Sequence, residues 1–144
     1  MSPQEIPVFC EMIAIYNKEI GKAIAAKKRL QYEQRSRFLG AGIDASTGGP
    51  LAAVAIKFED GETWELLDPE RWLDVYKKTR AAYRKYIDES IPEALDLYYE
   101  KGKNQTQAYT RAGVSRTKFF EQRKKFIWLL ALYALQDGVL SVDE

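Results

Sequence analysis

The residues with the clearest chemical potential in this chain are cations and amides near the C-terminus. Arg116, Lys118 and Gln122 occur within one short polar segment. In the major groove of duplex DNA, arginine and lysine hydrogen-bond the acceptor edge of guanine, and glutamine pairs with adenine. We therefore interpret these three side chains as candidates for reading base edges.

A second group of nearby residues is predicted to contact the DNA backbone, which sets register without reading sequence. Its members are Lys103, Asn104, Gln105, Thr106, Tyr109, Ser115, Thr117, Lys124 and Lys125. Gln105 and Tyr109 could contact either backbone or bases. The partner expected from both groups is double-stranded DNA.

The elements that would position these side chains form a predicted helix-turn-helix over residues 104–126. Asn104 and Gln107 have the spacing of a capping box, Gly113 falls where a short first helix must turn, and Ser115 can cap the second helix. In this motif the N-terminal turns of the second helix enter the major groove. On that helix we expect these side chains to face solvent: Arg116, Thr117, Lys118 and Gln122. Phe119, Phe126 and Ile127 are expected to face inward.

Charge is unevenly distributed along the chain, although the net charge is only +1. Residues 101–125 contain eight basic residues and one acid, a balance of +7, whereas residues 59–70 contain six acids and no base. A basic block attracts phosphate through counterion release, and the acidic block could aid solubility or face a protein partner such as host RNA polymerase.

The composition excludes several other kinds of site. Cys10 is the only cysteine and there is no histidine, so an internal disulfide, a Cys/His zinc site and a histidine-based triad are ruled out. No tight acidic cluster indicates magnesium. We expect no enzyme activity, no catalytic residues, no metal and no cofactor. Apolar runs too short to cross a bilayer and the lack of a signal-peptide pattern predict a cytoplasmic protein with no membrane partner.

The fold class predicted from periodicity is mainly α with one small β-hairpin. Residues 1–40 carry apolar side chains every three or four residues, which predicts one long amphipathic helix from Pro3 to about Leu39. Part of so long a helix could pair with a second subunit to form a homodimer, or it could pack on the later helices. Residues 41–50, rich in Gly, Ser and Thr, are predicted to be a linker.

Residues 51–67 change to an alternating pattern that predicts a β-hairpin. The preferred three-residue turn, 59–61, places Gly61 where a left-handed residue is needed. The register that follows pairs Val54 with Leu66 and Ile56 with Trp64.

Residues 68–144 are predicted to be a helical DNA-binding domain. A helix starting at Asp68-Pro69 mixes aromatic and basic side chains, which are expected to form core but could also stack single-stranded nucleic acid. A helix from Ser90 to near Gly102 would open the binding unit. After Lys125 the apolar sequence predicts that the recognition helix continues as a buried stem to about Gln136, which the first helix, the hairpin or a second subunit can cover.

The segment Gly113–Phe126, Gly-Val-Ser-Arg-Thr-Lys-Phe-Phe-Glu-Gln-Arg-Lys-Lys-Phe, resembles the C-terminal end of the ArpU-type phage and prophage transcriptional regulators. The resemblance extends over about residues 93–135 and is specific over Gly113–Lys125. It implies a sigma-factor-like helix-turn-helix that controls late phage genes by binding a promoter. The hairpin and the long first helix have no counterpart in this resemblance.

Two other functions stay open at this point. A small terminase subunit also joins a helix-turn-helix to oligomerising helices, although it usually carries the DNA unit first. A non-enzymatic adaptor could use the acidic hairpin and the aromatic helix to bind RNA polymerase or another regulator. Failure to bind any duplex at low salt would favour the adaptor.

Overall fold

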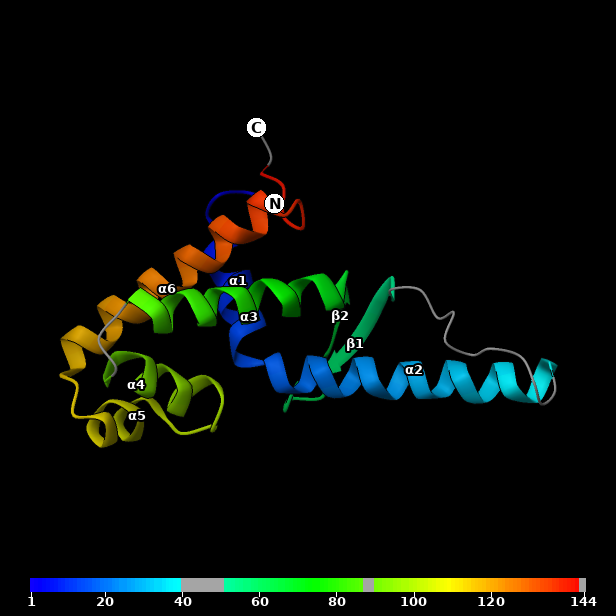
Figure 1. Ribbon diagram of the computed structural model, residues 1–144, viewed down its shortest axis with the longest axis horizontal. Helices are drawn as coiled ribbons and strands as arrows, with labels where there is room; N and C mark the ends of the chain where they lie inside the picture. Colours follow the sequence, from blue (N-terminus) through cyan, green and yellow to red (C-terminus); the bar gives the residue numbers. More distant parts are fainter. Residues whose placement is uncertain (40–50, 87–89, 143–144) are drawn as a thin grey trace. The chain divides into compact units, whose positions relative to one another are not determined.

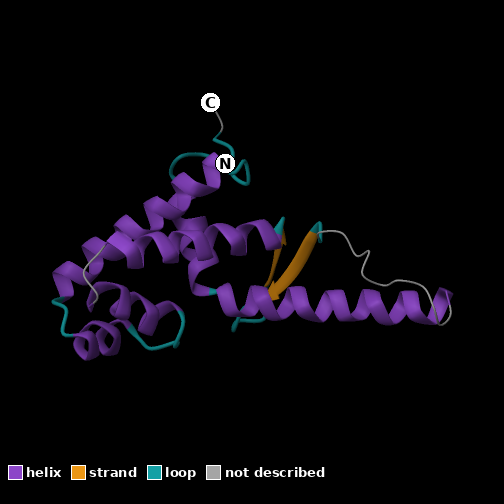
Figure 2. Cartoon of the chain, in the orientation of Figure 1, coloured by secondary structure: helices purple, strands orange, loops and turns teal. Residues whose placement is uncertain are grey.

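The computed structural model describes residues 1–39, 51–86 and 90–142. Over these residues the chain is mainly helical with one small antiparallel hairpin (Figures 1 and 2). The elements in chain order are α1 (Glu5–Ile15), α2 (Asn17–Leu39), β1 (Ala53–Lys57), β2 (Thr63–Leu67), α3 (Pro69–Tyr86), α4 (Ser90–Tyr99), α5 (Gln105–Ala112) and α6 (Arg116–Gln136). The predicted linker 41–50 lies outside the described residues.

The first long helix was predicted to be continuous, and this prediction is wrong. It is interrupted at Tyr16, where ψ is 16° and the α-helical path ends. The buried Asn17 amide donates to the carbonyl of Ala14 at 2.8 Å and to the carbonyl of Tyr99 at 3.1 Å. Asparagine competes in this way with regular helix hydrogen bonding. The apolar spacing persists on both sides of the break, so periodicity alone could not reveal it.

The helices and hairpin divide into two compact units. One consists of residues 1–17 and 72–144, and the other of residues 18–71. α1 therefore belongs with the C-terminal helices, which differs from the boundary expected at residue 40.

In the smaller unit the hairpin has the predicted register. Val54 pairs with Leu66 and Ile56 with Trp64, and Gly61 has a left-handed φ of 91° in the turn. Val54, Ile56 and Leu66 are buried. Lys27 of α2 donates to the carbonyl of Ala53 at 2.6 Å, and Lys28 forms an ion pair with Glu70.

The second half of α2 contributes no buried side chain to the smaller unit. Ile20 and Ile24 are buried, but every described side chain from Ala25 to Arg37 is exposed, including Leu30 at 54%. The first turns of α2 therefore supply its core contacts.

The larger unit has an aromatic core between α3, α4 and α6. The Phe126 ring packs edge-on against Tyr76 and Tyr83 and stacks with Tyr99 at 5.5 Å between centroids. All four side chains are at most 5% exposed. Trp72, Tyr76 and Tyr83 of α3 are thus core, as expected, and are not a stacking platform for single strands.

The stem of α6 was predicted to need cover on all sides, from the first helix, the hairpin or a second subunit, and within this chain one face of it is exposed. Phe126, Leu130 and Ala134 are buried, whereas Trp128, Leu132 and Leu135 are exposed. The apolar sequence follows two faces of α6, and within the described residues of this chain only one of them is covered.

Candidate nucleic-acid interface

α5 begins at a complete capping box. The Asn104 side chain accepts a hydrogen bond from the backbone N–H of Gln107 at 2.8 Å, and the Gln107 side chain accepts from the N–H of Asn104 at 3.3 Å. Two of the N–H groups that lack a partner at any helix start are thereby satisfied. The start of α5 is consequently set by local chemistry that the sequence spacing predicted.

The turn between α5 and α6 is equally well defined. Gly113 adopts a left-handed φ of 72°, and the N–H of Val114 donates to the carbonyl of Tyr109 at 2.9 Å. Ser115 then caps α6, because its hydroxyl accepts from the N–H of Lys118 at 3.2 Å. A left-handed glycine followed by an extended cap reverses the chain within three residues. These residues therefore set the direction in which α6 starts relative to α5.

The inner side of the two helices is packed. Ala108 of α5 and Phe119 of α6 are at most 1% exposed. The Phe119 ring packs against the rings of Tyr109 and of Tyr98 on α4, with ring centroids 5.8 Å and 6.0 Å apart, respectively. Phe119 is therefore the common anchor of the three helices, and Ala108 is small enough for α5 to approach it closely.

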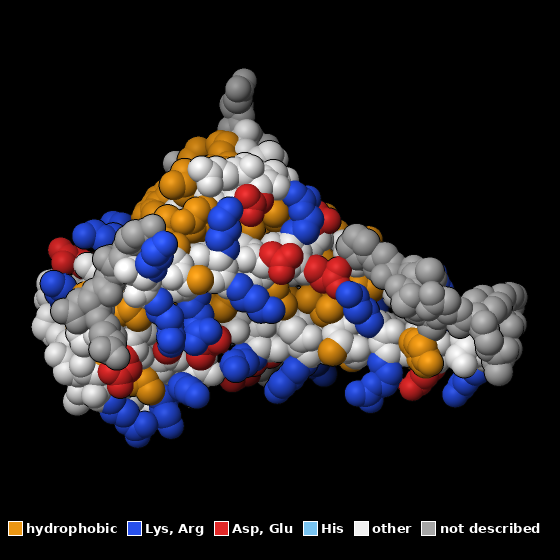
Figure 3. Space-filling model, in the orientation of Figure 1, with side chains coloured by type: hydrophobic (Ala, Val, Ile, Leu, Met, Phe, Trp, Pro, Cys, Tyr) orange, Lys and Arg blue, Asp and Glu red, His pale blue; other side chains and the backbone are white. Residues whose placement is uncertain are grey.

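The outer side of α6 carries cations. Four basic side chains within its first ten residues are exposed, namely Arg116, Lys118, Lys124 and Lys125, together with Thr117. The Arg116 guanidinium lies over the Phe120 ring at 5.6 Å, a cation–π contact that limits where the arginine can reach. Lys and Arg side chains also lie over α4 and α5 in the surface view (Figure 3). The start of α6 thus presents positive charge to solvent.

The predicted backbone-contacting residues have mixed exposure. Asn104, Thr106 and Ser115 are exposed, and Lys103, Gln105 and Tyr109 are half-buried. Asn104 and Ser115 already serve as helix caps through their side-chain oxygens. Together with Thr117, Lys124 and Lys125, these residues lie on or next to the helix pair 104–126.

Gln122 does not belong to this exposed face, and the expectation that its side chain faces solvent is wrong. It is only 8% exposed. The Tyr83 hydroxyl of α3 donates to its side-chain oxygen and lies 3.2 Å from its backbone carbonyl oxygen. Position 122 is three residues after Phe119 and four before Phe126. This spacing placed it on the buried face of the helix.

Arg123 is likewise a structural residue and not a free cation. It donates to Glu11 of α1 at 2.6 and 3.0 Å and lies over the Tyr98 ring at 4.6 Å. Burial acts to lower the pKa of Arg123, but the hydrogen bond and charge of Glu11 outweigh it, and the pKa is raised. The hydroxyl of Tyr99 also lies 3.0 Å from both Glu11 oxygens. Glu11 therefore ties α1 to α4 and α6.

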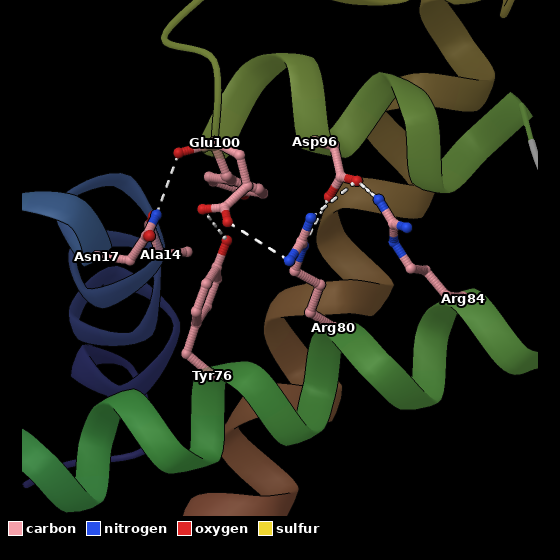
Figure 4. A network of polar contacts seen from close by, with 8 residues as sticks. Ala14, Asn17, Tyr76, Arg80, Arg84, Asp96 and Glu100 are labelled. Carbon is pink, nitrogen blue, oxygen red and sulfur yellow. Dashed lines mark hydrogen bonds and ion pairs between the residues drawn. The ribbon is translucent and has the colours of Figure 1, made fainter. Parts of the chain in front are cut away.

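A second polar network joins α4 to α3 (Figure 4). Asp96 accepts from Arg80 at 2.9 Å and also from Arg84, while Glu100 accepts from Tyr76 at 3.2 Å and lies 3.5 Å from Arg80. These arginines face acidic side chains of the same unit. Their role is to hold α4, and through it the helix pair α5–α6, against α3.

Little in the sequence indicates these networks. Glu11 lies 88 and 112 residues from its partners Tyr99 and Arg123. Such pairings depend on tertiary packing, which spacing along one helix cannot show. The burial of Gln122 did have a local signal in the sequence. Gln122 lies three residues after Phe119 and four before Phe126, so the three side chains share one face of the helix.

The described residues offer little for other kinds of site. They contain no group of three or more His, Cys, Asp or Glu side chains able to hold a metal ion. Cys10 is completely buried, and burial, with Glu11 adjacent, raises the pKa of its thiol to about 12. In the part of the chain that is described, no helix combines the length and apolar character needed to cross a membrane.

Comparison with known proteins gives no relative on which to base a function. No protein-family model matches the chain, and neither a curated protein nor a solved structure matches it.

Proposed function

We propose that this protein binds double-stranded DNA through the helix pair α5–α6 and acts as a transcriptional regulator. The observation that carries the proposal is a recognition-type helix with a capped start and an exposed cationic face. Arg116 and Lys118 occupy the first turn of α6, which is the part of such a helix that approaches base edges. Phe119, on the opposite side, fixes the helix to the domain.

The roles proposed for the side chains follow from their position and type. Arg116 and Lys118 contact base edges, and one well-placed bidentate pair discriminates against a wrong base by about 1–3 kcal/mol. Lys124 and Lys125, two turns further along, contact phosphates. Gln122 has no part in recognition, because it is buried.

The phage or prophage context rests on the sequence of Gly113–Lys125 alone. The structure supports one aspect of that resemblance, since the segment forms the turn and first half of the second helix in a helical pair. Control of late phage genes is accordingly the biological role we propose to test first.

The test measures binding of fluorescent duplexes to the full chain by anisotropy over a series of salt concentrations. Wild-type protein should bind random duplex at low salt, and its affinity should fall as the salt concentration rises. Lys124→Ala should weaken binding to all sequences and reduce the salt slope by about 1. Arg116→Ala should mainly lower the ratio of specific to random binding. Lys57→Ala, an exposed lysine on β1, is the matched control and should leave binding unchanged.

The specific sequence comes from selecting bound fragments of a prophage-containing genome with purified protein. Enrichment of a promoter-proximal motif would support regulation. Failure to bind any duplex at low salt would refute DNA binding and favour the adaptor alternative. Equal loss of specific and random binding in Arg116→Ala and Lys124→Ala would refute the division between base-reading and phosphate-contacting residues.

A further inference from the structure

α6 carries a second apolar stripe that no described part of the chain covers. Trp128, Leu132 and Leu135 recur at steps of four and three residues and are 48%, 52% and 39% exposed. Phe120 lies two turns before Trp128 and is also exposed. Figure 3 shows hydrophobic side chains gathered on the surface over this part of α6. Three large side chains in successive turns are unusual on a helix face that meets only water.

The stripe borders an apolar groove between α1 and α6. The groove has a volume of about 500 Å³ and is lined mostly by apolar side chains, including Val8, Met12, Phe120, Ile127 and Trp128. On the α1 side of the groove, the Val8 side chain is 64% exposed. Glu11, Arg123 and Lys124 also line the groove. Stripe and groove adjoin within a single compact unit, and we call the mainly apolar surface that they form together the α6 face.

We propose that the α6 face is the contact between two copies of this chain, with the two α6 helices antiparallel across a two-fold axis near Leu130. In such a two-fold contact the same patch meets itself. A crossing centred on Leu130 places Trp128 of each copy against Leu132 of the other.

The area of the α6 face is suited to a dimer. A fully buried Trp or Phe removes about 150–250 Å² from water, so the exposed parts of the stripe and of Val8 amount to roughly 500 Å² in each copy. Apolar patches of this size are at the upper end for monomers and commonly mark interaction sites. Two such patches approach the roughly 1,200 Å² at which stable interfaces begin.

The spacing of the recognition helices gives an independent argument, which rests on the proposed function. Lys118 lies twelve residues from Leu130 on a helix that is continuous over Arg116–Gln136. At about 1.5 Å per residue, the two Lys118 positions lie about 36 Å apart in the dimer. Successive major grooves on one side of duplex DNA are about 34–36 Å apart. The contact that covers the stripe thus also places both reading ends at the spacing of adjacent half-sites.

The contact is tested without DNA, by sedimentation equilibrium of the full chain over a concentration series. Wild-type protein should be dimeric, and Leu132→Glu should dimerise about tenfold or more weakly, because a carboxylate is placed in the apolar contact. Leu67→Glu, at an exposed leucine of the hairpin, is the matched control and should remain dimeric. Leu30→Glu tests the rival contact through α2 and should also remain dimeric. Circular dichroism and urea unfolding verify that each variant folds.

Mixing two variants tests the antiparallel register. Trp128→Lys and Leu132→Glu should each dimerise about tenfold or more weakly when alone, because each disrupts its own two-fold contact. Their mixture should form a heterodimer, since the new lysine then meets the new glutamate on one side and the native Trp–Leu contact survives on the other. This rescue also shows that both variants are folded.

Three results would overturn the proposal: a monomeric wild-type protein, an undisturbed dimer in Leu132→Glu, or loss of the dimer in Leu30→Glu alone. A monomer that instead binds another protein through the α6 face would likewise overturn it. A dimer that binds no DNA would refute the proposed function and leave the contact intact, whereas a DNA-binding monomer would do the reverse.

Discussion

The hydroxyl of Tyr83 on α3 donates a hydrogen bond to the side-chain oxygen of Gln122 on α6. Both residues are buried, and no buried side-chain nitrogen or oxygen among the described residues lacks a partner. The pair thus joins the helix proposed to read DNA to the helix that supports it. A residue type common in base recognition is here part of the core.

Gln122→Ala should consequently lower stability without changing base preference. The Tyr83 hydroxyl would keep only the backbone carbonyl of residue 122, at 3.2 Å, as an acceptor. We expect a loss of about 1–2 kcal/mol in the free energy of unfolding, measured by urea denaturation. Gln136→Ala, at an exposed position at the end of α6, is the control and should cost much less. A changed DNA motif in a folded Gln122→Ala protein would show that Gln122 does read bases.

Local sequence signals predicted most of the fold. The capping box at Asn104, the left-handed Gly113 and the hairpin register around Gly61 were all confirmed, because each depends on residues within a few positions of one another. The break at Tyr16 was missed, because part of its cause is the carbonyl of Tyr99, 82 residues from Asn17. Tertiary contacts of that kind leave no periodic trace in one sequence.

The candidate site was predictable to a lesser degree. Arg116 and Lys118 are exposed as expected, whereas Gln122 is not. The error arose from treating side-chain type as a guide to exposure, although helical spacing placed Gln122 between Phe119 and Phe126. The apolar sequence of α6 predicted a helix that needs cover on all sides, but it could not distinguish a face covered by its own chain from one that its own chain leaves exposed.

Glu11→Gln should loosen α1 from the rest of the larger unit. The change removes the charge that pairs with Arg123, and both side chains are about one-fifth exposed. We expect a loss of about 1–3 kcal/mol in the free energy of unfolding, moderated by this partial exposure. Glu33→Gln, at an exposed position of α2, is the control and should have little effect.

Cys10 provides a local readout for the Glu11 variant. Its thiol is completely buried with a pKa raised to about 12, so wild-type protein should react slowly with a thiol reagent at neutral pH. Because the Glu11 charge itself raises the pKa of the thiol, faster labelling in folded Glu11→Gln would report opening of α1 only if the increase remains after correction for the thiolate fraction, taken from the pH dependence of labelling. Unchanged labelling and stability would show that Glu11 does not anchor α1.

Gly113→Ala should destabilise the turn between α5 and α6 through the backbone alone. A Cβ atom at this position would meet nothing within 4 Å, but φ is 72°, which L-residues with a Cβ adopt at a cost. We expect a loss of about 1–2 kcal/mol by urea denaturation. Gly113→Asn should cost less, because asparagine tolerates the left-handed region. Equal losses for both substitutions would point to a different cause, such as a changed turn.

Three buried tyrosines should make the protein less stable as pH rises above about 10, the ordinary pKa of tyrosine. Burial is the main cause of a raised pKa for Tyr76, for Tyr83, where it reaches about 12, and for Tyr99. The nearby carboxylates of Glu100 and Glu11 raise the pKa of Tyr76 and Tyr99 further. The folded state therefore holds these protons more tightly than the unfolded state does.

Because unfolding then releases protons, the free energy of unfolding should fall with rising pH from about 10, by up to about 1.4 kcal/mol per pH unit for each tyrosine. Below about pH 9 these groups should contribute no pH dependence. Urea denaturation at several alkaline pH values measures the slope, which Tyr83→Phe should make shallower. Tyr32→Phe, at a largely exposed position of α2, should leave it unchanged. If tyrosinate absorbance showed every tyrosine of the folded protein titrating near pH 10, the raised pKa values would be refuted.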